Sequence, residues 1–292
     1  MVHIGMRSRV SMDNFNTITL IHNQADNLPR ILSAYASQTR LPDTFIFVLD
    51  RCNDNSENIL DEFSKQFKSK IITNNNGTGF LAGYCRDLVY TQYNDLPVIF
   101  LDGDCIPSPE LFAQFSEAFC NNIVIGSRKL ETKQGILDDR RTLIPWAKDY
   151  IFSPDELKEI DYTFLAKNGL LTISCCLGVS PSICRKIKEI NQKLYGVDRL
   201  FAPIFDGQYG GEDEFFGLTA MLWELPIVSI PTKHYVLHVE HANTTIDYEA
   251  KVTEQYTKLV DLADKLNAPG KYNIDFDYNM FVIDSIKNKL NK

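Results

Sequence analysis

Short runs of apolar residues alternate with segments in which apolar residues recur every three or four positions. The runs have the length and the β-branched or aromatic content of buried strands, and they are TITLI (17–21), TFIFVLD (44–50), KIITN (70–74) and PVIFLDGD (97–104). Between them, LPRILSAYASQT (28–39) and SENILDEFSKQF (56–67) have helical spacing. Because strands alternate with helices, the pattern predicts βαβ units in an α/β fold with a mostly parallel sheet.

The second half of the chain is less regular. Further elements are expected as a strand at 123–127, helices at 181–194 and 212–224, a strand-like stretch at 227–241, and helices at 247–267 and 277–290. The charged stretch 128–168 is read as an excursion with a short helix near 154–160. Since no linker stands out, we expect one domain over residues 1–245, with residues 246–292 as a C-terminal helical extension packed on it.

Charge and cysteine content narrow the class of protein. The 30 Lys and Arg against 38 Asp and Glu give a net charge of −8, which disfavours a protein that relies on bare polyanions. The seven cysteines form no CxxC pair, so buried thiols in a reducing cytoplasm are expected rather than disulfides or a zinc knuckle. No apolar run approaches the roughly 18 residues of a membrane span, and no signal peptide is recognisable. A soluble, cytoplasmic protein (in the host cytoplasm if phage-encoded) is expected.

Aspartates stand where predicted strands end, at Asp50, Asp102 and Asp104. In open parallel sheets, ligands bind at the carboxyl ends of the strands. Asp102 and Asp104 point to the same side of an extended segment, and Gly103 between them lets a ligand approach the backbone. Two hard oxygen ligands with open positions suit Mg²⁺ or Mn²⁺ completed by phosphate oxygens and water. The alternative interpretation is a solvated turn after a strand.

A glycine-containing loop before the third predicted helix is a candidate phosphate site. Asn76 and Gly79 bound the NGTG sequence, and Arg86 follows within reach of a pyrophosphate. Turn formation is the simpler explanation of such a sparse pattern.

Two later clusters add candidate catalytic groups. The sequence GGEDE at 210–214 precedes an apolar helix, and one of its acids could act as general base for a hydroxyl nucleophile. Helix capping is the alternative role for these acids. His238 and His241 would face opposite sides of a strand, so only one of them is expected to enter a site. That histidine could join the two aspartates around a metal, and a purely structural role is the alternative.

In this order, the segments resemble glycosyltransferases of family 2 with the GT-A fold over about residues 15–245. The resemblance is carried by TITLIHNQADNLPRILSAYASQT, FIFVLDRCNDNS, NNNGTGFLAGYCRD, VIFLDGDCIPSPELF, ISCCLGVSPSICRKI and YGGEDEFFGLTAML. It implies a Rossmann-like, mostly parallel central sheet flanked by helices. Asn53–Asp54 replaces the usual Ser-Thr-Asp, and Asp87 stands where asparagine is common.

The resemblance also implies a reaction. A nucleotide-sugar, UDP-glucose or similar, would donate its sugar to an acceptor hydroxyl with inversion. Asp50 would contact the nucleotide base, and Asp102 would contact the ribose or the metal. Asp104 and His238 would hold Mn²⁺ or Mg²⁺ on the diphosphate. Asp213 would be the general base that takes the acceptor proton. The remaining expected contacts are Asn76, Gly79, Arg86 and Gly103 toward the donor, and Gly211, Glu212 and His241 at or near the acceptor.

Other functions and several acceptors stay open at this point. A nucleotidyltransferase would show an N-terminal glycine-rich, basic phosphate loop, which HNQADN (22–27) is not. A non-catalytic carbohydrate-binding module would not need the paired acidic motifs. The acceptor is expected to be a glycan or glycoside, with hydroxymethylated or glucosylated bases of phage DNA as the alternative. A group of basic residues could line a groove that binds a polyanionic acceptor, and the alternative is a solvated loop. These residues are Arg128, Lys129, Lys133, Arg140 and Arg141.

Overall fold

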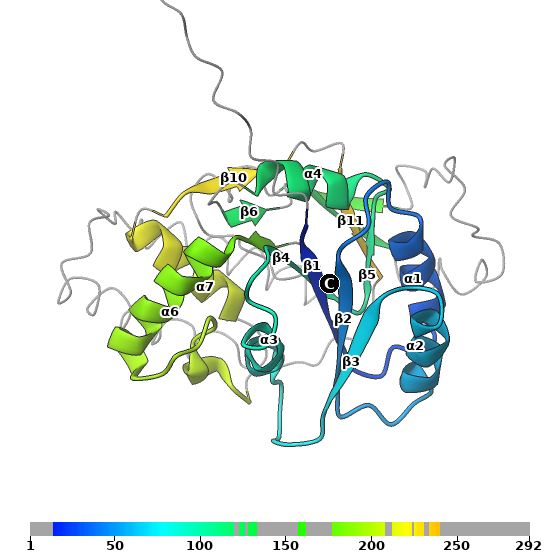
Figure 1. Ribbon diagram of the computed structural model, residues 1–292, viewed down its shortest axis with the longest axis horizontal. Helices are drawn as coiled ribbons and strands as arrows, with labels where there is room; N and C mark the ends of the chain where they lie inside the picture. The colour runs from blue at the N-terminus through cyan, green and yellow to red at the C-terminus, as the bar shows by residue number, and fades with distance from the viewer. Residues whose placement is uncertain are drawn as a thin grey trace, which may run out of the picture.

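A seven-stranded sheet forms the centre of the molecule (Figure 1). The computed structural model describes residues 14–119, 123–125, 128–132, 157–161, 177–207, 212–223, 225–230 and 234–239. The sheet has the order β10-β6-β9-β4-β1-β2-β3. Its strands are β1 (Asn16–Ile21), β2 (Thr44–Asp50), β3 (Ser69–Asn74), β4 (Val98–Asp102), β6 (Ile123–Ile125), β9 (Leu177–Val179) and β10 (Ile227–Ser229).

The sheet is mostly parallel, as the alternation of strands and helices predicts. β3, β2, β1 and β4 are parallel neighbours, and so are β10 and β6. β9 is antiparallel to both β4 and β6. The strand order reverses between β1 and β4, which is where ligand sites form in such sheets.

A second, four-stranded sheet has the order β5-β11-β7-β8. Its strands are β5 (Cys105–Pro107), β7 (Arg128–Thr132), β8 (Leu157–Asp161) and β11 (Val236–His238). The predicted short helix near 154–160 is therefore wrong over the described residues 157–161. A segment this short is marginal as a helix without packing, whereas pairing with β7 satisfies its backbone along its length. The short sheet matters for function because β11 pairs with β5, directly after the DxD segment.

Helices cover both faces of the central sheet (Figure 1). They are α1 (Leu28–Ala36), α2 (Ser56–Ser64) and α4 (Leu111–Ala118) around one hydrophobic cluster, and α3 (Ala82–Tyr90), α6 (Pro181–Tyr195) and α7 (Glu212–Leu222) around the other. The expected helices at 247–267 and 277–290, and with them the proposed extension 246–292, lie outside the described residues. Within the described part of the chain, no helix is both long and apolar enough to cross a membrane.

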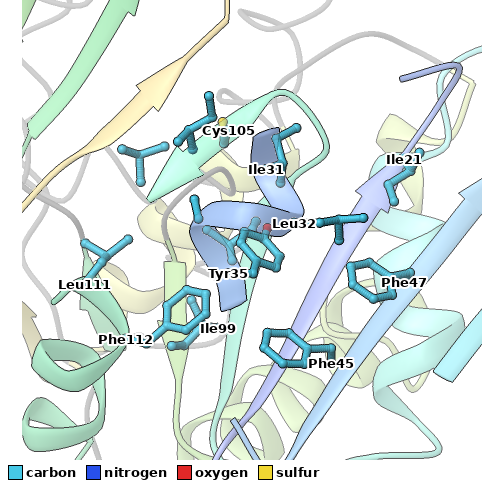
Figure 2. Close-up of a cluster of buried hydrophobic side chains, with 14 of the residues drawn as sticks. Ile21, Ile31, Leu32, Tyr35, Phe45, Phe47, Ile99, Cys105, Leu111 and Phe112 are labelled. Carbon is cyan, nitrogen blue, oxygen red and sulfur yellow. The ribbon is translucent and has the colours of Figure 1, made fainter. Parts of the chain in front are cut away.

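Side chains of β2 alternate between the two clusters, which explains its uninterrupted apolar sequence. Phe45 and Phe47 face Tyr35 of α1, with ring centroids 5.9 and 6.5 Å away (Figure 2). Phe112 of α4 meets the same tyrosine edge-on at 5.5 Å. The buried Tyr35 hydroxyl shares a 3.0 Å hydrogen bond with Thr19 of β1. These contacts fix α1 on the sheet and place the strand ends.

Candidate active site

The DxD segment begins where β4 ends. Asp102 is the last residue of β4 and stands in register with Leu20 of β1. An added Cβ on Gly103 would lie 2.7 Å from the Leu20 carbonyl oxygen. The protein's own backbone therefore occupies the space in front of this glycine, where the sequence suggested a ligand. Gly103 lets the chain turn against β1 and carry Asp104 into the site.

Asp104 meets His238 because of the second sheet. β11 pairs antiparallel with β5, which places His238 opposite Cys105. The His238 Nε2 lies 3.4 Å from Asp104 Oδ2, and the Cys105 thiol donates to Asp104 Oδ1 at 3.1 Å. Of the two histidines considered in the sequence, His238 thus lies beside the DxD segment, whereas His241 falls outside the described residues.

These groups fit a hard divalent cation. Asp102, Asp104 and Cys105 offer ligand atoms that all lie within 4.8 Å of one another. Carboxylate oxygens and an imidazole suit Mn²⁺ or Mg²⁺, while a thiol is a softer ligand. Burial and the charge of Asp104 raise the pKa of Asp102 against the attraction of Arg86. A cation would offset the repulsion between the two carboxylates.

Arg86 joins the DxD segment to the acidic motif. Its guanidinium lies inside the protein and donates from Nη2 to Asp102 Oδ1 at 2.5 Å and from Nη1 to Glu212 Oε1 at 3.0 Å. The guanidinium carbon also lies 5.6 Å from the centre of the Phe201 ring. With 1% of Arg86 exposed, the structure shows a buried bridge between two carboxylates. Its expected contact with a pyrophosphate stays a prediction.

Glu212 and Asp213 open α7 at this bridge. Glu212 is buried, and burial together with the charge of Asp213 raises its pKa to about 7, against the attraction of Arg86. Its Oε2 has no hydrogen-bond partner among the described residues. Asp213 is partly exposed, and its charge also raises the pKa of Asp102. The carboxylates of Asp102, Asp104, Glu212 and Asp213 thus lie in one region. Gly211, also expected near the acceptor, lies outside the described residues.

Gly83 allows α3 and α7 to approach each other. A Cβ at this position would lie 2.9 Å from Phe201 Cβ and 3.4 Å from Glu212 Cγ. Gly83 is one helical turn before Arg86, so the two residues share one face of α3. This face carries the Glu212 contact.

Asp87, the residue after Arg86, holds the chain that precedes α7. Its carboxylate accepts hydrogen bonds from the Leu200 and Phe201 backbone N–H groups at 2.6 and 3.0 Å. Arg199 Nε donates to it at 3.1 Å, and Nη2 of the same arginine reaches Asp206 at 3.0 Å. Burial raises the pKa of Asp87 to about 6 despite these donors. An aspartate in place of the common asparagine thus anchors residues 199–206 to α3.

The expected contact region for the nucleotide base lies where β2 and β3 end. Asp50 and Asn74 are paired in register, and Asn74 Nδ2 donates to Asp50 Oδ1 at 2.8 Å. Asn76 N in turn donates to Asn74 Oδ1 at 3.2 Å. Gly79 has φ +74°, and a Cβ there would lie 2.5 Å from the Gly207 carbonyl oxygen. The glycine-containing loop is therefore shaped by contacts within the protein.

Sequence comparison decides the family. The profile described as Glycosyl transferase family 2 matches residues 17–187, more than half of the chain. The chain belongs to glycosyltransferase family 2. No match is found among curated protein sequences.

Solved structures show the fold that this glycosyltransferase shares. Staphylococcus aureus TarS 1–349 in complex with UDP-GlcNAc has a TM-score of 0.60 at 15% identity, over 88% of this chain and 68% of that one. GalNAc-T7 with UDP, GalNAc and Mn²⁺ has 0.55 at 14%, over 85% and 47%. The Pyrobaculum calidifontis mannosyltransferase PcManGT with GDP-Man and Mn²⁺ has 0.50 at 13%, over 88% and 65%. The glycosyltransferase thus has the GT-A fold and spans about half the length of the GalNAc-T7 chain.

The glycosyltransferase has site residues that sequence reasoning missed. Arg51 was overlooked although it directly follows Asp50, and it binds that carboxylate through Nε and Nη2 at 2.9 and 2.6 Å. Cys105 follows Asp104 directly, and Phe201 contacts Arg86 from a distant segment. Adjacency to a motif aspartate was the available signal for Arg51 and Cys105, whereas no local signal marked Phe201.

Proposed function

We propose that this glycosyltransferase transfers a sugar from a UDP-linked donor, UDP-glucose or similar, to an acceptor hydroxyl with inversion. The observation that carries the proposal is the double ion pair of Arg86, which joins Asp102 to Glu212. It brings the candidate metal ligands and the candidate base, Asp213, into one site.

Asp102, Asp104 and His238 would hold Mn²⁺ or Mg²⁺. When bound, the cation would supply positive charge to the leaving diphosphate. The close approach of the Asp102 and Asp104 carboxylates supports this assignment. So does the position of His238 Nε2, 3.4 Å from Asp104 Oδ2. Similar folds solved with Mn²⁺ and a nucleotide or nucleotide-sugar support it too, namely GalNAc-T7 and PcManGT.

Asp213 is the proposed general base. Its partly exposed carboxylate stands in the first turn of α7, beside the buried Glu212. It would take the proton of the acceptor hydroxyl while the oxygen bonds to the anomeric carbon and the bond to the nucleoside diphosphate breaks on the opposite face. One base without a covalent intermediate yields an inverted product.

A glycan or glycoside is the proposed acceptor. The net charge of −8 disfavours binding to the phosphate-rich backbone of DNA. Of the basic run proposed to guide a polyanion, Arg128 and Lys129 lie in β7, and Lys133, Arg140 and Arg141 lie outside the described residues.

The first experiment tests the base. We expect Asp213→Asn to keep UDP affinity in Mn²⁺ within about twofold and to lower transfer at least about 100-fold, because the amide cannot accept the proton. Calorimetry measures UDP binding, and transfer from UDP-glucose is measured on oligosaccharides and on hydroxymethylated DNA. Glu189→Gln, on an exposed position of α6, is the control. Near wild-type transfer by Asp213→Asn would refute the assignment, and NMR of the product tests inversion.

Donor turnover without acceptor separates the other functional classes. A glycosyltransferase releases UDP and free sugar slowly from UDP-glucose. A nucleotidyltransferase would release pyrophosphate from a nucleoside triphosphate, and a carbohydrate-binding module would do neither.

A further inference from the structure

Arg51 follows Asp50 at the end of β2, and its backbone turns sharply. It has φ +49°, in the left-handed region that side chains other than glycine disfavour. Its N–H donates to the Asn74 carbonyl oxygen at 2.8 Å, which holds the turn against β3. Neighbouring side chains on a strand point to opposite faces. The left-handed turn instead lets Arg51 fold back onto the carboxylate that precedes it.

The guanidinium covers the Asp50 carboxylate. Nε donates to Oδ1 at 2.9 Å and Nη2 to Oδ2 at 2.6 Å, so both carboxylate oxygens are engaged. The Arg51 side chain is 24% exposed and that of Asp50 is 7% exposed. A ligand arriving at the end of β2 therefore meets mainly the arginine, with the aspartate beneath it.

The same guanidinium is tied to the glycine-containing loop. Nη2 also donates to the Gly79 carbonyl oxygen at 2.6 Å, whereas Nη1 lies 3.5 Å from the Gly77 carbonyl oxygen. Of the five N–H donors of an arginine, three have close partners within the chain. Nη1 is thus the nitrogen best placed to donate to a ligand.

We propose that Arg51 reads the base of the donor and selects uridine over guanosine nucleotides. This inference rests on the proposed function, in which the nucleotide lies at the end of β2. Uracil has one N–H between two carbonyl oxygens, so it pairs with a donor beside an acceptor. Guanine offers two adjacent N–H donors, which need two open acceptors. Arg51 supplies the donor. Its bonds to the two Asp50 oxygens and the Asn74 bond to Oδ1 leave Asp50 one open acceptor position among the described residues, on Oδ2, which favours uracil.

Calorimetry with UDP and with GDP, both in saturating Mn²⁺, tests the inference. We expect the wild-type protein to bind UDP about tenfold or more tightly than GDP, within the range that one bidentate contact discriminates. Arg51→Ala should lower UDP affinity and reduce this ratio to about threefold or less. Arg51→Lys keeps the positive charge but lacks the planar guanidinium with its several N–H donors, so it should also reduce the ratio of UDP to GDP affinity. Arg185→Ala, at an exposed position of α6, should leave it unchanged.

The outcomes separate this inference from the proposed function. If both Arg51 variants keep the wild-type ratio, or if the wild-type protein binds GDP as tightly as UDP, the role of Arg51 is refuted while a glycosyltransferase activity on UDP-glucose would stand. If the wild-type protein binds neither nucleotide and turns over no donor, the proposed function fails as well. Circular dichroism checks folding, and if Arg51→Ala does not fold, Arg51→Lys decides.

Discussion

At the scale of single residues, the buried guanidinium of Arg86 connects the carboxylates of the site. Arg86 contacts Asp102 and Glu212 directly, and the charge of Asp213 acts on all three. Truncating a buried charge leaves its partner uncompensated, which is costlier than losing an exposed pair. Removing the Arg86 charge would therefore leave Asp102 and Glu212 without their buried counter-charge.

Glu212 makes stability depend on pH. Its pKa of about 7 in the folded protein exceeds the 4.5 of an exposed glutamate. Between these values the folded state retains a proton that the unfolded state has released, so its stabilising contribution is complete below about pH 4.5 and is lost as pH rises through about 7. We expect Glu212→Gln, which cannot ionise, to gain free energy of unfolding relative to wild type between about pH 5 and pH 8.

Urea unfolding at both pH values measures this difference. Glu189→Gln, the exposed control on α6, should follow the wild type. A Glu212→Gln curve parallel to the wild-type curve would mean that Glu212 is ionised at both pH values.

At the scale of elements, α3 organises the site. Gly83 and Arg86 contact α7, and Asp87 holds residues 199–201. This explains why one helix carries a glycine, a buried arginine and a buried aspartate within five positions. α3 thus connects the proposed donor side of the site with the proposed acceptor side.

Gly83→Ala tests this packing. An alanine in a helix is normally favourable by up to about 1 kcal/mol, but here its Cβ would lie 2.9 Å from Phe201 Cβ. We expect a loss of about 1–3 kcal/mol in the free energy of unfolding, as for overpacked cores. We also expect kcat to fall about tenfold, because a displacement of α7 by a fraction of an ångström misplaces Asp213.

Gly196→Ala is the matched control for Gly83→Ala. Gly196 ends α6 with φ +71°, and beyond its chain neighbours no heavy atom of the described residues lies within 4 Å of an added Cβ. The Gly196→Ala protein should lose about 1 kcal/mol in the free energy of unfolding from backbone strain alone and should keep the wild-type kcat. A Gly83→Ala protein with wild-type stability and kcat would show that α3 and α7 can separate without consequence.

At the scale of the whole molecule, two hydrophobic clusters hold helices on both faces of the sheet, while its strand ends carry the polar site. Rigid packing of the two clusters holds carboxylates close together at the strand ends, although they repel one another. A bound cation and nucleotide should therefore stabilise the folded state.

Thermal unfolding measures this stabilisation. With Mn²⁺ and UDP at about 100 times its Kd, linkage adds about 2.7 kcal/mol, and we expect Tm to rise by about 5 °C. EDTA should abolish the rise, and Asp104→Asn should show little of it because one candidate ligand is lost. An equal rise in EDTA would refute a metal-dependent donor site.

The sequence by itself determined the sheet-forming runs, their flanking helices and the DxD segment at a strand end. It could do so because the period and length of apolar runs are local properties. The resemblance to family 2 was carried by the order of motifs, and the profile over residues 17–187 confirms it. The expected helix near 154–160 failed because β7 supplied backbone partners that no local pattern shows.

Only the tertiary structure decided how the motif residues meet. Arg86 and Glu212 are 126 positions apart, and their contact requires α3 and α7 to pack at Gly83. His238 reaches Asp104 through pairing of β11 with β5. Arg51 reaches Asp50 through a left-handed turn stabilised by Asn74. Such contacts depend on long-range packing and strand pairing, which fix distances between side chains that the spacing along the chain leaves undetermined.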